Sequence, residues 1–284
     1  MITQMVIIGI GALGMTIVII SGGIDLSVGS QVALCTVVTA SSLNFMSGSD
    51  PGVLIPIIAA VLGISACAVC GFFNGIIVAK MRIVPFIVTL GMMQIARGIA
   101  KWVGKEQTVV TPVNWLQNLM LIDPKPGWLV FAPGVWLTVA FLGILAIVLK
   151  RTIFGRYTFA LGSNASTARL CGVNVAAYRV WTYVLCGAFT GLAGVMQYAN
   201  LTVGDPTAAT GMELDIIAAV VIGGGSLNGG EGSAHGSIVG ALIMAVLRNG
   251  CNMLDVPNYV QDIIIGAIII CAVMIDRLRH SVRF

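Results

Sequence analysis

Charge is what this sequence has least of. Asp, Glu, Lys and Arg make up 9% of its 284 residues, whereas hydrophobic residues make up 58%. Soluble domains carry roughly 25% charged residues. The composition therefore excludes a water-soluble protein and indicates a chain that lives in a lipid bilayer.

Motifs for chemistry are missing as well. The sequence contains no GxxxxGK[ST] motif to cradle ATP phosphates and no HExxH motif, and it has only two histidines. Ser27 has no histidine in a matching segment that could activate it as a nucleophile. Cys67 and Cys70 form a CxxC inside an apolar run without a second cysteine pair, which favours packing over metal or redox chemistry. We therefore expect no enzymatic activity, no catalytic residue, no metal site and no cofactor bound by this chain.

Long uncharged segments recur along the chain. A spanning helix needs about 20 mostly apolar residues, and six segments approach or exceed that length before three shorter ones near the C-terminus. The nine segments are Met5 to Ser21, Gln31 to Met46, Gly52 to Ala79, Ile83 to Ala96, Leu129 to Leu149, Val180 to Val203, Ile216 to Asn228, Gly236 to Leu247 and Ile263 to Ile275. We predict an all-α polytopic membrane protein with about nine transmembrane segments, in which residues 1–284 form a single transmembrane domain.

The positions of the charges predict the orientation, because Lys and Arg near helix ends stay on the cytoplasmic side. With a cytoplasmic C-terminus, alternation assigns ten of the 15 cations to the cytoplasm, in groups of two, five and three within residues 80–82, 150–179 and 277–283. Eight of the 11 acids then fall outside or near the outer face: Asp50, Glu106, Asp123, Asp205, Glu213, Asp215, Asp255 and Asp262. Nine segments put the N-terminus outside, from which we expect one more helix before Met1.

Two glycine-containing stretches interrupt the apolar pattern. They are Gly22 to Ser30 and Gly223 to Ser233, the second with six glycines in eleven residues. Each is either a tight polar turn between helices or a broken helix that shapes a transport pathway, where protein or a water-filled cavity satisfies the irregular backbone. Gly23 to Ser27 and Gly211 to Asp215 share the order Gly, apolar, acid, Leu, polar. This echo fits transporter repeats that are related across the membrane plane.

Three long motifs have an unusual composition. They are SGGIDLSVGS at Ser21 to Ser30, GRYTFALGSNASTARLCGVNV at Gly155 to Val175, and DPTAATGMELDIIAAVVIGGGSLNGGEGSAHGSIVGALIMAVLRNG at Asp205 to Gly250. Together they resemble the permease subunits of bacterial ribose, galactose, xylose and arabinose ABC importers, over nearly the whole chain. The resemblance implies ten transmembrane helices with the first one missing here, broken helices and a cytoplasmic coupling loop. The usual Gly-Gly-Asn of that loop reads Gly162-Ser163-Asn164 in this sequence.

The same resemblance implies the partners. Such a permease is a dimer in the bacterial inner membrane, with an identical or paralogous second copy, an extracytoplasmic sugar-binding protein and a separate cytoplasmic ATP-binding subunit that uses the ATP. Membrane lipid surrounds it, and no nucleic acid partner is expected. The missing ATP-binding motif agrees with this division of labour.

The loop from Lys150 to Arg179 carries five cations and no acid. Within it, Asn164 can cap a short helix that Gly172 stops. Basic residues such as Lys150, Arg151 and Arg156 also satisfy the positive-inside rule by touching lipid headgroups, which is the simpler interpretation for those three. The resemblance implies ATPase coupling by Gly162, Asn164, Ala168, Arg169, Gly172 and Val173, with a second cytoplasmic turn at Asn228, Gly229, Gly230 and Gly232.

Uncharged polar groups suffice to line a passage for a neutral polyhydroxylated solute, which must bind weakly to be released. The candidates for the substrate pathway are Gly22, Gly23, Asp25, Ser27, Asn74, Gln94, Asn249 and Asn252. For any single amide, hydrogen bonding between helices is the simpler role. Asp25 either caps the helix that starts near Leu26, contacts the substrate, or pairs with an arginine from elsewhere in the fold.

We therefore expect the membrane-spanning permease subunit of an ATP-driven, binding-protein-dependent importer of a monosaccharide. One alternative keeps the architecture and changes the cargo to a nucleoside, a furanosyl signal or a branched-chain amino acid. The other is an autonomous channel or ion-coupled carrier. That alternative lacks a clear set of acids near the bilayer midplane to bind a coupling ion.

Overall fold

The computed structural model describes residues 2–46, 52–121 and 130–281. Its helices are α1 (Ile2–Ile20), α2 (Val28–Met46), α3 (Leu54–Met81), α4 (Pro85–Val103), η1 (Trp115–Met120), α5 (Pro133–Arg151), α6 (Ile153–Leu170), α7 (Val175–Leu201), α8 (Met212–Ile222), α9 (Ala234–Met253) and α10 (Asn258–Ser281). The two-residue strands β1 (Val109–Val110) and β2 (Val203–Gly204) form an antiparallel pair. The all-α architecture is confirmed.

Each of the nine expected apolar segments corresponds to a helix. Within the described residues, seven helices are long and apolar enough to cross a membrane. The exceptions are α8, with 11 residues, and α10, whose apolar part covers Asn258–Met274. The expected segment Ile216 to Asn228 is wrong in its bounds, because α8 begins at Met212 and ends before Gly223. The total of nine spans stays a prediction. Asp50, Asp123 and Arg283, which enter the charge counts, lie outside the described residues.

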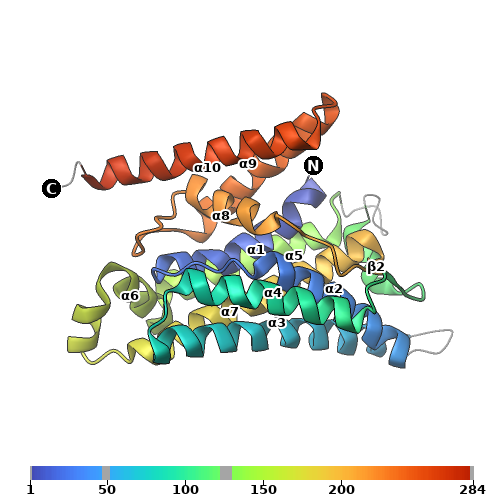
Figure 1. Ribbon diagram of the computed structural model, residues 1–284, viewed down its shortest axis with the longest axis horizontal. Coiled ribbons are helices and arrows are strands. Elements are labelled where there is room, and N and C mark those ends of the chain that lie inside the picture. Colours follow the sequence, from blue (N-terminus) through green and yellow to red (C-terminus); the bar gives the residue numbers. More distant parts are fainter. Residues whose placement is uncertain (1, 47–51, 122–129, 282–284) are drawn as a thin grey trace.

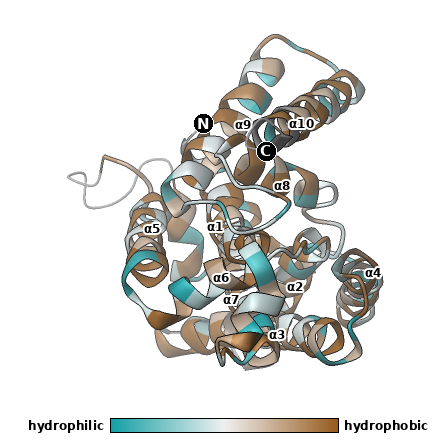
Figure 2. Ribbon diagram, turned by 90° about the vertical axis from the view of Figure 1, so that its left-hand side faces the viewer, coloured by the Kyte–Doolittle hydropathy of each residue, from teal (hydrophilic) through white to brown (hydrophobic). Residues whose placement is uncertain are grey.

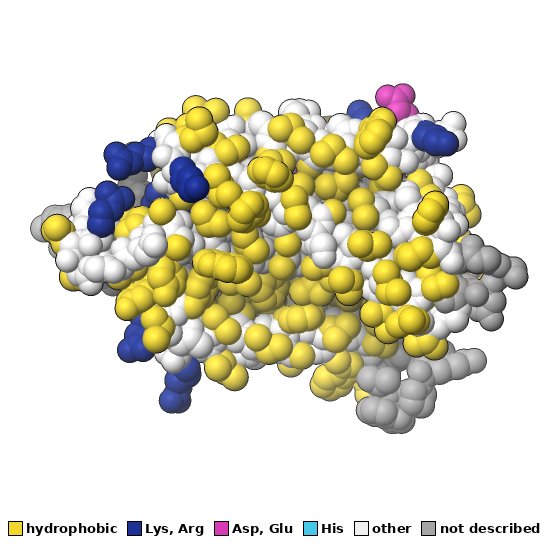
Figure 3. All heavy atoms as spheres, turned by 90° about the horizontal axis from the view of Figure 1, so that it is seen from below, with side chains coloured by type: hydrophobic (Ala, Val, Ile, Leu, Met, Phe, Trp, Pro, Cys, Tyr) yellow, Lys and Arg dark blue, Asp and Glu magenta, His cyan; other side chains and the backbone are white. Residues whose placement is uncertain are grey.

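The helices run roughly along the long axis of the molecule, with α6 and the C-terminus at one end and β2 at the other (Figure 1). We call these the α6 end and the β2 end. Viewed along the bundle, α1 lies in the middle, whereas α9 and α10 project to one side (Figure 2). A broad band of hydrophobic side chains covers the face shown in Figure 3, with Lys and Arg near its two ends. This distribution is that of a multi-pass membrane protein.

Small residues hold α3 and α7 close together. A Cβ placed on Gly191 would lie 2.6 Å from the Cα of Ile64, and one on Gly75 would lie 2.7 Å from the Cα of Val180. A Cβ on Gly187 would collide with the carbonyl oxygen of Cys67. Packing at backbone distance is how membrane helices associate without a hydrophobic driving force. The glycines of α7 therefore serve helix packing.

The segment between α1 and α2 turns back into the membrane. The Nδ2 of Asn74 donates to the Oγ of Ser27 at 3.1 Å. Asn74 lies seven residues before Met81, the last residue of α3, which corresponds to about 10 Å at 1.5 Å per residue. The chain therefore reaches the α6 end at Gly22 and returns inward before α2 begins at Val28. The course of the chain agrees with a helix break in this stretch, whereas its part in a transport pathway stays a prediction.

A second inward segment, which the sequence did not reveal, precedes α8. The backbone N–H of Asp205 donates to Thr36 Oγ1 at 3.3 Å, whereas a Cβ on Gly29 would lie 2.7 Å from the carbonyl oxygen of Ala209. Thr36 and Gly29 are seven residues apart on α2, about 10 Å along its axis. Residues 205–211 thus descend beside α2 from the β2 end. Glu213, expected near the outer face, therefore lies deeper, against the first turn of α2.

Arg97 on α4 satisfies the backbone of this inward segment. Its Nη1 donates to the carbonyl oxygens of Pro206 at 2.9 Å and Ala208 at 2.7 Å. Irregular backbone at membrane depth needs such partners, since lipid offers none. The sequence echo now has a structural meaning: each copy sits where a helix starts inside the membrane, and α2 runs toward the β2 end whereas α8 runs toward the α6 end. Opposite directions are the signature of inverted repeats.

Candidate functional site

Four polar residues meet where α2 begins. The backbone N–H of Ser27 donates to Asp25 Oδ1 at 2.9 Å, and the Ser27 hydroxyl donates to the same oxygen. The Nε2 of Gln31 and the Nδ2 of Asn74 donate to Ser27 Oγ at 2.7 and 3.1 Å. All four side chains are buried. We call Asp25, Ser27, Gln31 and Asn74 the break cluster. Sequence analysis identified three of its members and missed Gln31.

Asp25 acts as a helix cap in this arrangement. A carboxylate oxygen that accepts from the first free backbone N–H of a helix satisfies a donor that has no partner within the helix. No ion pair to Asp25 is formed within the described ranges, where Arg248 and Asp215 make the salt bridge. The geometry agrees with the cap interpretation and disfavours a pairing of Asp25 with arginine.

Three oxygens of the break cluster keep spare acceptor capacity. Asp25 Oδ2, Gln31 Oε1 and Asn74 Oδ1 are buried without a hydrogen-bond partner among the described residues. A 180° turn of either amide exchanges its oxygen for a donor nitrogen, so these amides can also serve the carboxyl. The cluster can therefore accept hydrogen bonds from water or from a hydroxylated solute. Alternatively, the turned amides of Gln31 and Asn74 can donate to the carboxylate of Asp25.

Three glycine segments that are far apart in the sequence meet at the α6 end. The backbone N–H of Gly230 donates to the carbonyl oxygen of Ile20 at 2.8 Å. A Cβ on Gly162 would collide with both of these backbone groups, and a Cβ on Gly229 would lie 2.9 Å from the Cα of Gly22. We call Gly22, Gly162, Gly229 and Gly230 the glycine junction. It joins the first break, the α6 loop and the turn after α8 by backbone contact.

The turn after α8, expected to be cytoplasmic, contains backbone conformations that favour glycine. Gly229, Gly230 and Gly232 adopt φ values of +85°, +78° and +154°, which side chains rarely tolerate. Asn228 is exposed beside them. The turn packs against Gly22 and Gly162 at the α6 end, and its glycine conformations agree with the tight-turn interpretation.

The short helix expected at the coupling loop is present. Helix α6 is kinked at Asn164, which has a φ of −158° and ψ of 97°, and the Oδ1 of Asn164 accepts from the backbone N–H of Thr167 at 2.9 Å. Gly172 follows the last turn with a φ of +83°, the usual geometry of a helix stop. Ala168 and Val173 are buried in a small cluster, whereas Arg169 is exposed. The cap and stop signals were read correctly.

Three arginines surround a cavity of about 420 Å³ next to this helix. Arg82, Arg169 and Arg179 line it together with Gly22, and no acid is found among the described lining residues. A concave surface with one sign of charge attracts the opposite sign. The cavity can thus receive acidic groups of a partner at the α6 end.

The remaining pathway candidates do not join the break cluster. Gln94 is exposed on α4. Asn249 is half-buried and its Nδ2 contacts the sulfur of Met253 at 3.4 Å. Asn252 accepts from Gln261 Nε2 at 2.9 Å and lines a cavity near the β2 end. Their shared polarity in apolar segments could not reveal which helix face each one occupies.

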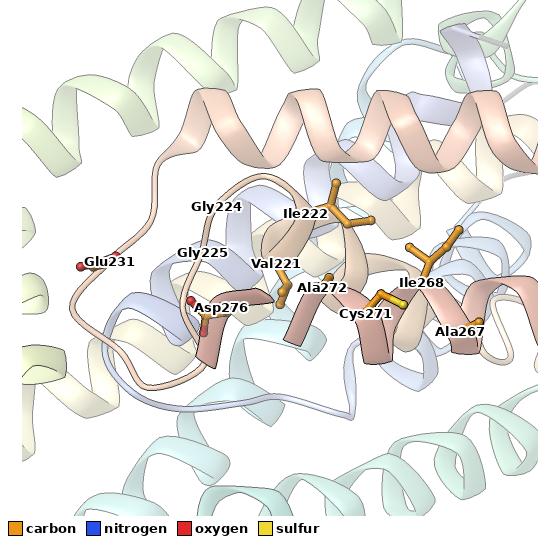
Figure 4. Close-up of a pocket in the computed structure, with 10 residues that line it drawn as sticks. All are labelled: Val221, Ile222, Gly224, Gly225, Glu231, Ala267, Ile268, Cys271, Ala272 and Asp276. Carbon is orange, nitrogen blue, oxygen red and sulfur yellow. The ribbon is translucent and has the colours of Figure 1, made fainter. Parts of the chain in front are cut away.

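Another cavity, of about 460 Å³, separates α8 from α10. Figure 4 shows apolar side chains of both helices along it, including Ile222 and Ile268, with Glu231 and Asp276 near one end. The Oγ of Ser226 donates to Asp276 Oδ2 at 2.9 Å and ties α10 to the turn after α8. The apolar lining suits lipid or helix packing better than a polar cargo.

Comparison with known proteins gives a consistent answer. The profile of the family described as "Branched-chain amino acid transport system / permease component" matches residues 1–273. Ribose import permease protein RbsC of Escherichia coli (strain K12) is 41% identical over 277 residues, 95% of this chain and 82% of that protein. Its namesake in Bacillus subtilis (strain 168) is 37% identical over 278 residues, 98% of this chain and 84% of that protein. L-arabinose transport system permease protein AraH of Escherichia coli (strain K12) is 34% identical over 281 residues, 97% of this chain and 80% of that protein. No solved structure matches the chain.

Proposed function

Because the chain belongs to the family of branched-chain amino acid transport system permease components, we propose that it is the membrane-spanning subunit of an ATP-driven, binding-protein-dependent importer of a monosaccharide. It is a transport subunit rather than an enzyme. The membership confirms the resemblance read from the three motifs. A pentose is the favoured cargo, since relatives at 34–41% identity are named for ribose and arabinose.

The glycine junction is the observation that best supports an ATP-driven mechanism. It connects α6, the element proposed to meet the ATPase, with the end of α1 and with the turn after α8. Backbone contacts transmit a displacement directly, whereas long side chains can absorb it by changing rotamer. Movement of α6 would therefore shift the end of α1 and the turn after α8 together.

The proposed partners follow from the family. They are a separate ATP-binding subunit, an extracytoplasmic sugar-binding protein and a second permease copy or paralogue, in the lipid of the inner membrane. This chain itself holds no cofactor, and ATP is used by the partner. Exposed apolar side chains on α3 and α4, such as Phe73 and Ile87, offer surface for lipid or for the second copy.

The α6 end, with the C-terminus, is proposed to face the cytoplasm. Arg82, Arg169 and Arg179 gather there, as the positive-inside rule requires. The exposed Ser163 offers a test. In a background without Cys171, Cys251 and Cys271, the cysteines that are not buried among the described residues, Ser163→Cys should react with an impermeant maleimide in inside-out vesicles only. Reaction in right-side-out vesicles would reverse the orientation.

Reconstitution tests the function itself. Proteoliposomes that contain this chain, the ATP-binding subunit and the ribose-loaded binding protein should accumulate ribose only with ATP. Uptake by the chain alone would instead identify a channel or ion-coupled carrier. Stimulation of ATP hydrolysis by a binding protein loaded with a nucleoside, a furanosyl signal or a branched-chain amino acid, and not with a sugar, would assign the alternative cargo.

Charge reversal at Arg169 tests the coupling role. Arg169→Glu should leave membrane insertion intact, because the side chain is exposed. It should lower ribose uptake and binding-protein-stimulated ATP hydrolysis by about tenfold, since a like charge opposite an acidic partner costs several kcal/mol. Arg156→Glu is the matched control, as Arg156 is exposed on the same helix but does not line the arginine cavity. Equal activity of the two variants would remove Arg169 from the contact.

A further inference from the structure

A polar cavity of about 260 Å³ opens near the β2 end between α1, α7, α8 and α9. Ligand pockets for drug-sized molecules hold about 300–1,000 Å³, so this cavity is of a size for a smaller solute. Uncharged side chains supply most of its polar groups: Gln4, Gln197, Asn200, Thr210 and Asn252. Ile7, Ile8, Met212 and Ala245 supply apolar surface.

Arg248 and Asp215 are the charged residues among the described lining of this cavity. The Nε of Arg248 donates to Asp215 Oδ2 at 2.8 Å and its Nη2 donates to Oδ1 at 3.0 Å. The two charges therefore compensate each other in a bidentate pair, and Asp215 is buried while Arg248 stays partly exposed. A neutral pair of this kind favours neither an anionic nor a cationic ligand.

The pair nevertheless keeps directional hydrogen-bonding capacity. A guanidinium has five N–H donors in a fixed plane, and a carboxylate has lone pairs beyond the two used here. Gln197 adds an amide that is only 8% exposed and forms no side-chain hydrogen bond within residues 2–46, 52–121 and 130–281. Fixed donors beside fixed acceptors match adjacent hydroxyl groups, each of which both donates and accepts.

We propose that this cavity is a sugar-binding station on the β2 side of the membrane, in which Arg248, Asp215 and Gln197 hydrogen-bond the hydroxyl groups of a neutral monosaccharide. The proposal rests on the proposed importer function and adds to it the place where the permease first holds its cargo. Binding there is weak, because a passage must release what it takes up.

Helix α8 connects the station with the membrane breaks. Asp215 lies in the first turns of α8, and on the same helix Glu213 lies against Gly29 at the start of α2, next to the break cluster. The start of α8 thus separates the station from the break cluster. The other end of α8 leads into the turn that contributes Gly229 and Gly230 to the glycine junction. A displacement of that junction would move the floor of the station.

Protection of a cysteine from labelling tests occupancy directly. Asn252→Cys, in the assembled importer with Cys171, Cys251 and Cys271 replaced by serine, should react with N-ethylmaleimide at least about threefold more slowly in excess ribose, as expected for an occluded site at millimolar affinity. Glycine betaine at equal osmolarity should give no protection. Asn118→Cys is the matched control, because Asn118 is an exposed amide outside the cavity.

Substitution of the pair tests its role. Arg248→Lys keeps the charge but loses the bidentate geometry, so the protection of Asn252→Cys by ribose should disappear. Gln197→Ala leaves the ion pair intact and should also weaken the protection by ribose. This variant provides the test in case Arg248→Lys does not assemble. Unchanged labelling in ribose, in an importer with normal ATP-driven uptake, would overturn the station and leave the importer function standing. Absence of ATP-driven uptake in the unaltered complex would instead overturn the proposed function.

Discussion

Replacement of Gly162 by alanine should nearly abolish transport. Alanine is the better helix former by about 1 kcal/mol, so the local effect of the change on α6 is favourable. The added Cβ, however, would collide with the carbonyl oxygen of Ile20 and the backbone nitrogen of Gly230. Ordinary C···O contacts lie at about 3.3 Å or more, and backbone cannot rotate away as a side chain can.

The collision outweighs the gain in helix propensity. Overpacking costs about 1–3 kcal/mol, and separation of Gly230 from Ile20 forfeits their hydrogen bond, worth about 1 kcal/mol more. We expect ribose uptake and binding-protein-stimulated ATP hydrolysis to fall to about a tenth or less, given that 1.4 kcal/mol is a factor of ten. Both are measured in proteoliposomes normalised to assembled complex.

Gly91→Ala provides the matched control for this prediction. Gly91 lies in the interior of α4, and a Cβ there meets nothing within 4 Å. This variant should transport as well as the unaltered protein. Normal transport by Gly162→Ala would show that the glycine junction opens without cost, and the backbone connection between α6 and the breaks would have to be abandoned.

Substitutions of Asp25 should show whether the protein needs its hydrogen-bond acceptor or its negative charge. Asp25→Asn keeps an oxygen that can accept from the backbone N–H of Ser27, so most of the transport should remain. Asp25→Ala removes the cap and leaves the buried donors of Ser27 unsatisfied, at a cost of about 1–3 kcal/mol. The amount of assembled complex recovered from the membrane, and its thermal stability, should fall accordingly.

Asp205 provides a control for Asp25, because it makes the same kind of hydrogen bonds in a more exposed place. Asp205 Oδ1 accepts from the backbone N–H and hydroxyl of Thr207, both at 2.7 Å, where Thr207 is exposed. Asp205→Ala should therefore cost less, because water replaces the lost acceptor. If Asp25→Asn assembled normally and yet failed to transport, the charge itself would be required, and Asp25 would belong to the gating or substrate-binding groups rather than to the scaffold.

Local signals were sufficient for much of this protein. Composition indicated a membrane protein, because helices that cross the hydrocarbon core need long apolar segments with few charged residues. The cap at Asn164 and the stop at Gly172 were readable because each acts on backbone groups within a few residues. The matching order of residues at Gly23 and Gly211 fitted a repeat, but it did not reveal that residues 205–211 run inward before α8.

Contacts between distant segments were decided by the tertiary structure alone. Nothing in the glycines at positions 162 and 230 indicates that they meet Ile20, because a missing side chain carries no information about what fills its space. The pairing of Arg248 with Asp215 depends on the antiparallel packing of α9 against α8. The inward course of residues 205–211 likewise depends on Arg97 from another helix. The sequence determined where helices start and stop, through short-range hydrogen bonding and polarity. Packing of segments far apart in the chain, such as those that bring Gln4 and Asn252 to one cavity, determined which of them form a site.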